Sequence, residues 1–237
     1  MMRASLCVPR STNFNAVLVR LGMMPLHYRL AFRAMSTFYR IHSERAGPAM
    51  QELLEDFQKS ASGWVKTFFL VHAHNNIAYF QSYSEDNILE APTARSFSNR
   101  LQKAMYSELT HQWQLQSIAA HTKMILPKWE PFKFFKRPVS KEVEVWFMRC
   151  CFSQNFTLAF KQKCNPQKSD TCRGCNAASE TVSHILLECP VATNERKNLS
   201  LKVSELSLRN LLGNPEAMQA TESFIASSKL HKIFHNL

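Results

Sequence analysis

Residues 171–190 read TCRGCNAASETVSHILLECP, which sets three cysteines and one histidine in the pattern Cys172-x2-Cys175-x8-His184-x4-Cys189. Zinc favours such a donor set, with sulfur at ~2.3 Å and nitrogen at ~2.0 Å from the ion. A site with four protein ligands leaves no coordination position for a substrate or a water molecule. The stretch therefore predicts a structural zinc knuckle over residues 172–189. The alternative is a chance grouping in a chain with seven cysteines and nine histidines.

The residues between the second cysteine and the histidine predict a short helix. Ser179 is expected to cap its start, and Glu180 lies where the positive end of the helix dipole favours a carboxylate. Gly174, between the first two cysteines, is expected to let the backbone turn tightly enough for both sulfurs to face one ion. The knuckle is thus predicted as a tight turn followed by a helix that carries His184.

The last ligand requires this helix to end early. Cys189 lies five residues after His184, which on an unbroken helix is ~140° further around the axis. Pro190 disfavours the α conformation of the residue before it. We therefore expect the helix to fray before Cys189.

Apolar residues recur at three- and four-residue steps along most of the chain and predict an all-α fold. Pro25 is expected at the start of one helix, Gly213 as a C-terminal cap, and Asn214-Pro215 at the start of the last helix. Only five glycines in the chain disfavour a strand-and-turn architecture. The positions expected to face the core are Leu26, Leu30, Ala34, Phe38 and Ile41; Met50, Leu53, Leu54 and Phe57; Phe97, Leu101, Met105, Leu109 and Trp113; Val143, Trp146, Phe147, Cys150 and Cys151; and Met218, Phe224, Ile225 and Phe234.

Two stretches predict loops or linkers. Residues 82–93 are polar and irregular, and residues 127–138 contain three prolines. They divide the chain into three expected regions, 1–81, 82–138 and 139–237, the last of which contains the knuckle.

The charge balance indicates a polyanionic partner. Twenty-nine Lys and Arg against eighteen Asp and Glu give a net charge of +11 and suit RNA or DNA. The basic residues are spread along the chain and not gathered on one amphipathic helix, which disfavours an anionic membrane surface. A soluble protein that happens to be basic is the open alternative.

No apolar run reaches the ~20 residues of a membrane span, and the first residues lack the apolar core of a signal peptide. An intracellular location, in the nucleus or cytoplasm, is therefore expected. The remaining cysteines, Cys7, Cys150, Cys151 and Cys164, are expected to be buried thiols in a reducing compartment.

Two groups of residues are candidates for nucleic-acid contacts. Near the knuckle, the candidates for phosphate contacts are Lys163, Lys168, Arg173, Arg196 and Lys197. In the proline-containing run, basic residues alternate with aromatic ones that could stack on bases: Lys128, Trp129, Phe132, Lys133, Phe134, Phe135, Lys136 and Arg137. The alternative for the second group is that the aromatic rings pack against helices while the basic residues face water.

Three segments of the chain resemble one protein family. Residues 6–41, LCVPRSTNFNAVLVRLGMMPLHYRLAFRAMSTFYRI, resemble the region just beyond the catalytic core in the reverse transcriptases of non-LTR retrotransposons. The segment CRGCNAASETVSHILLECP resembles their C-terminal Cys-Cys-His-Cys motif, and LLGNPEAMQATESFIASSKL is similar to the closing helix. The resemblance implies a C-terminal fragment of such a polyprotein, with a thumb-like helical region over 1–81 and a zinc-stabilised helical subdomain after the middle helices.

That family copies its RNA into DNA at a nicked target, so the resemblance implies element RNA, target DNA and the rest of the polyprotein as partners. Polymerase chemistry needs clustered carboxylates that hold two metal ions. Here Asp56, Asp86 and Asp170 are isolated from one another, and no Tyr-x-Asp-Asp sequence is present. His72 and His74 lack a further ligand at metal-binding spacing.

We therefore expect a nucleic-acid-binding protein that is not an enzyme and has no small-molecule substrate. The competing hypothesis is an inert remnant of a retroelement. In it, zinc only stabilises the fold or shapes a protein-docking module.

Overall fold

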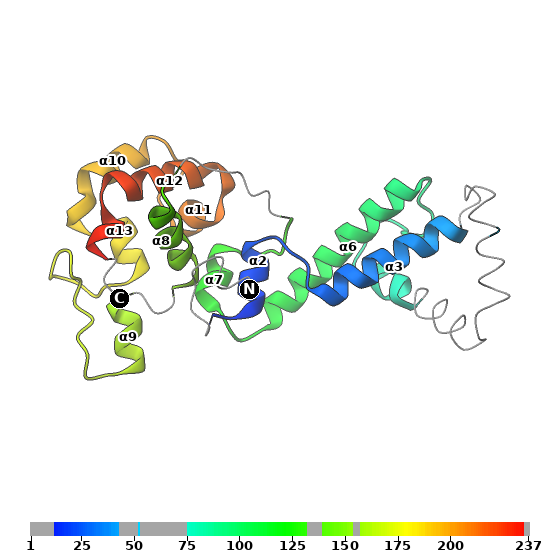
Figure 1. Cartoon of the computed structure of the whole chain (residues 1–237), viewed down its shortest axis with the longest axis horizontal. Coiled ribbons are helices and arrows are strands. Elements are labelled where there is room, and N and C mark those ends of the chain that lie inside the picture. The colour runs from blue at the N-terminus through cyan, green and yellow to red at the C-terminus, as the bar shows by residue number, and fades with distance from the viewer. Residues whose placement is uncertain (1–11, 43–51, 53–74, 132–138, 154–156, 235–237) are drawn as a thin grey trace. The chain divides into compact units, whose positions relative to one another are not determined.

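The computed structural model describes residues 12–42, 52, 75–131, 139–153 and 157–234 (Figure 1). In these residues the regular structure is helical apart from one isolated antiparallel bridge between Thr171 and Ser179. The predicted all-α fold is confirmed. No helix in this part of the chain combines the length and the apolar character needed to cross a membrane.

Contacts group the chain into two compact units. One combines the described parts of Met1–Leu21 and Gln116–Leu237, and the other is Gly22–Leu115. We call them the discontinuous unit and the middle unit. This grouping differs from the three expected regions, because periodicity along the sequence contains no information about which distant helices pack together.

The middle unit is built on two long helices that pack side by side, α3 (Leu26–His42) and α6 (Ala94–Leu115) (Figure 1). Residues 75–81 add a helical segment, and the residues from 82 to 93 form turns and bends, as predicted. Along α6 the predicted core positions are all buried, from Phe97 at one end to Trp113 at the other. The 3.6-residue period therefore predicted this helix and its inner face correctly.

A buried carboxylate ties the elements of the middle unit together. Glu108 of α6 is fully buried and accepts hydrogen bonds from the hydroxyls of Tyr28 on α3 and Tyr79 on the 75–81 segment, the latter at 2.9 Å. Burial, reinforced by the nearby Glu108 carboxylate, raises the pKa of both tyrosines above its usual value. Both hydroxyls thus remain donors to Glu108 at neutral pH.

The inner face of α3 differs from the prediction. Leu26 and Leu30, expected in the core, are 67% and 57% exposed, whereas Tyr28 and Met35 are buried. Tyr28 reaches Glu108, and its ring lies 5.9 Å from that of Phe80, so this polar and aromatic contact decides which face of α3 meets α6. Ala34 and Phe38 are half-buried. The side chains of Ile41, Met50, Leu53, Leu54, Phe57, His72 and His74 lie outside the described residues.

The discontinuous unit is a cluster of short helices. α12 lies among α8, α10, α11 and α13 and contacts each of them (Figure 1). The predicted core positions in α8 and in the last helices, Val143, Trp146, Phe147, Cys150, Cys151, Met218, Phe224, Ile225 and Phe234, are all buried. The elements are α2 (Phe14–Arg20), α7 (Ala120–Ile125), α8 (Lys141–Phe152), α9 (Leu158–Cys164), η1 (His184–Glu188), η2 (Pro190–Ala192), α10 (Thr193–Ser200), α11 (Leu208–Gly213), α12 (Pro215–Ser227) and α13 (Leu230–Ile233).

Polar N-cap residues begin several of these helices. The side chains of Ser140, Thr157 and Ser207 each accept a hydrogen bond from the backbone N–H three residues later, at 3.2 to 3.4 Å. Asn214 caps α12 in a related way, since its side chain accepts from the N–H of Glu216 at 3.0 Å. Asn214-Pro215 begins a helix as predicted, but this is not the last helix, because α12 ends at Ser227 and α13 follows it.

Gly213 has a different role from the predicted cap. It is the last residue of α11, and a Cβ atom at this position would lie 2.5 Å from the carbonyl oxygen of Ile125 in the segment that forms α7. Glycine therefore permits the close approach of α11 to α7. The polar cap that follows is Asn214.

A buried arginine joins the N-terminal helix α2 to the C-terminal helices. Arg20 is fully buried, and its Nη1 donates a hydrogen bond of 2.6 Å to the carbonyl oxygen of Leu212 in α11. The guanidinium carbon also lies 5.2 Å from the ring centroid of Phe147 in α8. These contacts explain why residues near the start of the chain belong to the same unit as the metal-ligand cluster.

Candidate metal centre

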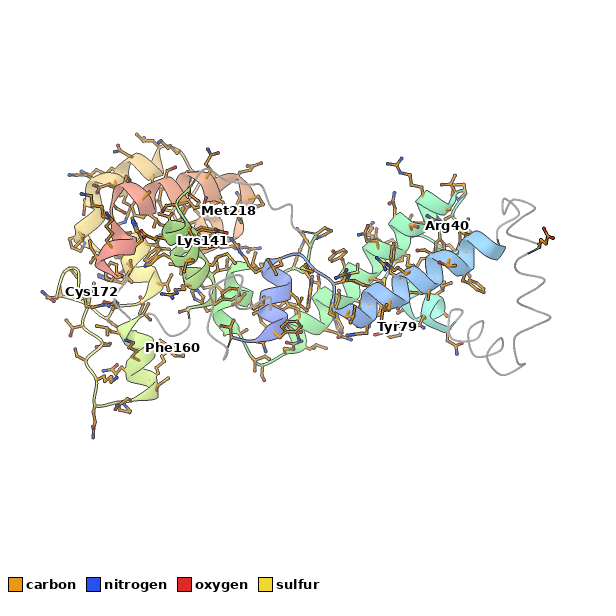
Figure 2. The ribbon with its side chains drawn as sticks, in the orientation of Figure 1. Arg40, Tyr79, Lys141, Phe160, Cys172 and Met218 are labelled. Atoms are coloured by element: carbon orange, nitrogen blue, oxygen red, sulfur yellow. The ribbon has the colours of Figure 1, made fainter. Side chains whose placement is uncertain are left out.

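The four predicted ligands converge in the discontinuous unit. Their ligand atoms, the sulfurs of Cys172, Cys175 and Cys189 and a ring nitrogen of His184, all lie within 4.8 Å of one another. Figure 2 labels Cys172 in the loop that follows α9. The four residues form a group that could hold a metal ion.

Two of the distances between ligand atoms are close to those of tetrahedral coordination. Cys172 Sγ lies 3.9 Å from Cys189 Sγ, and Cys175 Sγ lies 3.3 Å from His184 Nε2. Four bonds of ~2.3 Å arranged as a tetrahedron would separate two sulfurs by ~3.8 Å. Cys172 and Cys189 are fully buried, and Cys175 is half-buried. The donor set and its spacing both suit a metal that prefers sulfur and nitrogen.

The turn that presents the first two cysteines is closed by backbone hydrogen bonds. The N–H of Cys172 donates to the carbonyl of Ala178 at 2.7 Å, and the N–H of Asn176 donates to the carbonyl of Cys172 at 2.8 Å. Asn176 has a φ of 56°, the left-handed conformation that asparagine tolerates better than most residues. The left-handed residue of the knuckle is therefore Asn176.

Gly174 was expected to supply that tight turn, but it serves packing. A Cβ atom on Gly174 would lie 3.0 Å from Cζ of Phe234 and 3.2 Å from Cγ2 of Val191. The missing side chain makes room for these two residues. This tertiary contact could not be predicted from local turn chemistry.

The helix start also differs from the prediction. Ser179 pairs with Thr171 in the antiparallel bridge, and the capping hydroxyl is that of Thr181. Its Oγ1 accepts a hydrogen bond of 3.0 Å from the N–H of His184. The bridge holds Ser179 in an extended segment, so the cap falls two residues later.

The helix end explains how the histidine and the last cysteine meet. The N–H of Cys189 donates to the carbonyl of His184 at 2.7 Å, a bond that spans five residues, and η1 is a single π-helical turn. The predicted end of the helix before Cys189 is confirmed. Instead of fraying, the last turn widens, which brings residues i and i+5 toward one side of the axis.

The carboxylate of Glu180 makes hydrogen bonds that support the knuckle. It is fully buried and accepts hydrogen bonds from the N–H of Leu158 and the N–H of Arg173, each at 3.0 Å. The Arg173 guanidinium donates two more, from Nε at 2.9 Å and Nη2 at 2.7 Å. Glu180 was expected to favour a helix dipole, but it instead joins the start of α9 to the cysteine turn.

This pairing gives Arg173, which was predicted to contact phosphate, an internal partner. The guanidinium is held by Glu180 and lies 5.6 Å from the ring centroid of Phe234. Arg196, also expected at phosphate, is nearly buried and donates to the carbonyls of Leu186 at 2.9 Å and Cys189 at 2.7 Å. Both arginines stabilise the knuckle from within.

The other residues predicted to contact nucleic acid differ in their exposure to solvent. Lys128, Lys163, Lys168 and Lys197 are exposed. Trp129 is only 2% exposed, so it cannot stack on a base, and here the alternative of a packed ring holds. Phe132, Lys133, Phe134, Phe135, Lys136 and Arg137 lie outside the described residues, as does Cys7. Among the cysteines outside the cluster, Cys150 and Cys151 are buried as expected, whereas Cys164 is exposed.

The thiols of Cys175 and Cys189 differ in pKa. A hydrogen bond from the N–H of Ala177 lowers the pKa of the Cys175 thiol to about 7, while burial raises the pKa of Cys189 to about 11. His184 Nε2 faces the cysteines, and its Nδ1 lies 3.7 Å from a carboxylate oxygen of Glu188. The Nδ1 atom is buried and makes no hydrogen bond at this distance.

Sequence patterns missed the residues that support the ligands. Arg173 and Glu180 have opposite charges on the two arms of one turn, which is a usable signal for an internal pair. No sequence pattern indicated the internal role of Arg196, because its hydrogen-bond partners are backbone carbonyls. A metal ion bound by all four side chains would have no coordination position left for a substrate or a water molecule. No known protein family, curated protein or solved structure matches the chain.

Proposed function

We propose that the chain is a zinc-containing, nucleic-acid-binding region of a reverse-transcriptase-like retroelement protein. The observation that carries the proposal is the convergence of the four ligand atoms within 4.8 Å. A bound zinc ion would join the cysteine turn to η1 and fix the segment between α9 and α10. The partners expected from the resemblance are element RNA, target DNA and the remainder of the polyprotein.

The surface around this segment supports a polyanionic partner. Lys163, Lys168 and Lys197 are exposed, and in the described part of the chain none of them has an acidic side chain within ion-pairing distance. The nearby Arg173 and Arg196 are engaged internally, so we assign phosphate contacts to the lysines and a structural role to the arginines. The net charge of +11 favours such contacts over the whole chain.

The metal is tested first. We expect one zinc ion per chain by native mass spectrometry, and a Co2+-substituted protein with the absorption of tetrahedral thiolate coordination. The double variant Cys172→Ser, Cys175→Ser should lose both signals. A protein that binds no zinc after reduction and refolding in its presence would overturn the metal site.

Nucleic-acid binding is tested on the zinc-loaded protein by fluorescence anisotropy with single-stranded RNA and duplex DNA over a salt series. Replacing Lys163, Lys168 and Lys197 by alanine should weaken binding and lower the salt slope by about 2 to 3, because each phosphate contact contributes ~0.7 to 0.9. The matched control removes three positive charges elsewhere, at Arg95, Lys103 and Lys141. Equal weakening by both sets would contradict a contact surface at the knuckle.

A protein-docking module is the second candidate. Leu201, just after α10, is 86% exposed, and Val191 in η2 is 38% exposed. Exposed apolar side chains beside a zinc-stabilised segment can seat a protein partner. A zinc-loaded protein that binds neither RNA nor duplex DNA would favour this function and reject the first.

A further inference from the structure

The discontinuous unit contains a second candidate site, a cavity whose lining includes none of the four metal ligands. Its volume is about 320 Å³, which lies within the range of small-molecule sites. The walls come from the starts of α2 and α7, the end of α8, α9 and Thr181, all of which belong to this unit. Packing between segments that are distant in sequence therefore forms the cavity.

Hydrogen bonds between two elements hold one wall of the cavity in place. Thr122 in α7 donates from Oγ1 to the carbonyl oxygen of Cys151 in α8 at 3.3 Å. The neighbouring His121 places Nε2 2.9 Å from the carbonyl oxygen of Cys150, so this nitrogen carries the hydrogen and donates. The start of α7 is therefore fixed against the last turn of α8 where both line the cavity.

The lining residues offer hydroxyl donors. Thr157 Oγ1 accepts from the N–H of Phe160 at 3.3 Å, and Thr181 Oγ1 accepts from the N–H of His184 at 3.0 Å. Neither hydroxyl hydrogen has an acceptor among the described residues. Thr12 is only 1% exposed, and its hydroxyl has no hydrogen-bond partner in the same part of the chain. Because an unpartnered buried hydroxyl is costly, a ligand that accepts hydrogen bonds would be favoured here.

The charge of the lining favours an anion. Lys163 is its one cationic side chain, and no aspartate or glutamate is among the described residues that line the cavity. Lys163 is exposed and has no acidic side chain within ion-pairing distance in the described chain. Phe152, Phe160 and several alanines supply apolar surface; Phe160 is labelled in Figure 2. The lining thus suits a ligand with an acceptor-rich anionic group and a small apolar body.

Two of the lining residues have a left-handed backbone. Ala119 has a φ of 59° and Ser153 a φ of 47°, and only four described residues other than glycine lie in this region. Alanine rarely adopts this conformation, because its Cβ approaches the following carbonyl oxygen. Strained backbone of this kind concentrates at binding sites, where the surrounding structure imposes it. The backbone therefore agrees with the hydroxyls in marking the cavity as a ligand site.

We infer that this cavity binds a small organic phosphate monoester. A phosphoryl group has three acceptor oxygens, which suit the hydroxyls of Thr12, Thr157 and Thr181, and the ammonium of Lys163 supplies the counter-charge. A carboxylate has only two oxygens and would satisfy fewer of these donors. The organic body would pack against the aromatic rings of the lining.

This ligand site goes beyond the function proposed above. It requires neither a nucleic acid nor direct contact with a metal ion, and it gives the chain a small-molecule partner that the sequence did not predict. Lys163 is shared with the surface assigned to nucleic acid, so the test measures small-ligand binding alone.

The test uses the full-length, zinc-loaded protein in a phosphate-free buffer. Isothermal titration calorimetry measures the binding of phenyl phosphate, inorganic phosphate, benzoate and benzyl alcohol, which separate the contributions of the phosphoryl group, the charge and the ring. We expect phenyl phosphate to bind at one site per chain, at least about tenfold more tightly than the other three compounds. Only phenyl phosphate supplies both the acceptor oxygens and the apolar body.

Two lysine variants locate the site. Lys163→Gln should weaken phenyl phosphate binding by about tenfold or more, because the charged hydrogen-bond partner is lost. Lys168→Gln is the matched control, since Lys168 is also exposed but does not line the cavity, and it should leave the affinity unchanged. Ala120→Phe, at an exposed lining position, should block the cavity without removing a charge. Circular dichroism checks that each variant keeps its helicity.

Thr12→Val separates a ligand contact from a structural role. Valine keeps the shape of the side chain and removes the hydroxyl, so phenyl phosphate binding should weaken severalfold. The Tm should stay the same or rise, because an unpartnered buried hydroxyl is lost. A lower Tm with unchanged binding would show instead that the hydroxyl serves the fold and would contradict its assignment to the ligand.

Three results would overturn the inference. One is the absence of saturable phenyl phosphate binding at millimolar concentration. Another is an equal loss of affinity in Lys163→Gln and Lys168→Gln, which would indicate attraction to the overall positive charge. The third is binding of benzoate or inorganic phosphate as tight as that of phenyl phosphate, which would reject an organic phosphate as the ligand. Since no nucleic acid enters these measurements, their failure is distinguishable from failure of the nucleic-acid proposal.

Discussion

Glu180 illustrates how one buried charge can organise a small metal-binding segment. A carboxylate removed from water is costly unless its oxygens are fully hydrogen-bonded. Here both oxygens are satisfied, by two backbone N–H groups and by the guanidinium of Arg173. The residue therefore holds the cysteine turn against the start of α9.

Replacing Glu180 with glutamine should destabilise the zinc-loaded protein by about 2 kcal/mol, because it leaves Arg173 without its counter-charge and places an amide against backbone donors. The measurement is thermal unfolding at fixed free zinc. Glu205→Gln, at an exposed position, is the matched control and should change stability by less than ~0.5 kcal/mol. Equal effects of the two variants would show that Glu180 contributes only as a surface charge.

The thiols predict a dependence of zinc binding on pH. Metal ligation requires thiolates, so each thiol still protonated at the working pH releases a proton on binding. Cys189, whose pKa is raised to about 11 by burial, releases a proton at pH 8, whereas Cys175, with its pKa lowered to about 7 by the Ala177 N–H, is already mostly ionised. Zinc affinity should therefore rise at least about tenfold per pH unit between pH 7.5 and 8.5.

Competition with a chelator of known affinity measures this slope, and calorimetry in buffers of different ionisation enthalpy counts the protons. Below pH 7 the slope should steepen, because Cys175 then also starts protonated. An affinity that stays constant from pH 7.5 to 8.5 would contradict the raised pKa of Cys189.

At the scale of the element, the π turn of η1 leaves backbone carbonyls at its C-terminal end that need donors. Arg196, from the next α-helix, supplies them at Leu186 and Cys189. The short helix that carries His184 is thus completed by a side chain outside it. Its position, and with it the distance from His184 to Cys189, depends on α10.

Arg196→Ala should lower the stability of the zinc-loaded protein by about 2 kcal/mol and weaken zinc binding, because two charge-assisted hydrogen bonds are lost. The neighbouring Lys197→Ala is the control, since Lys197 is exposed and should leave zinc affinity unchanged. Thermal unfolding and chelator competition measure the two quantities. If Arg196→Ala binds zinc as tightly as Lys197→Ala, η1 does not need its cap.

At the scale of the whole molecule, the metal-ligand cluster belongs to a unit assembled from both ends of the chain. Arg20 of α2 reaches the carbonyl of Leu212, and α11 meets α7 at Gly213. These contacts join segments that are up to 192 residues apart in sequence. Long-range packing therefore assembles the unit that contains the knuckle.

Gly213→Ala tests the tightest of these approaches. Alanine would gain about 1 kcal/mol of helix propensity. Its Cβ, however, would fall 2.5 Å from the carbonyl oxygen of Ile125, a backbone atom that cannot rotate away, and overpacking of this kind costs about 1 to 3 kcal/mol. We expect net destabilisation in thermal unfolding, whereas Gln219→Ala on the exposed side of α12 should be neutral. A more stable Gly213→Ala protein would show that α11 and α7 can separate freely.

The sequence by itself determined the all-α class, the inner faces of α6 and α8, and the four residues that converge as candidate metal ligands. These follow from local spacing, because a helical period or a ligand pattern is written in neighbouring residues. The tertiary structure alone decided the inner face of α3, the roles of Gly174 and Gly213, and the internal use of Arg196. Each of these depends on a partner that is distant in sequence or on a backbone carbonyl. Such partners produce no repeating pattern in the amino-acid sequence.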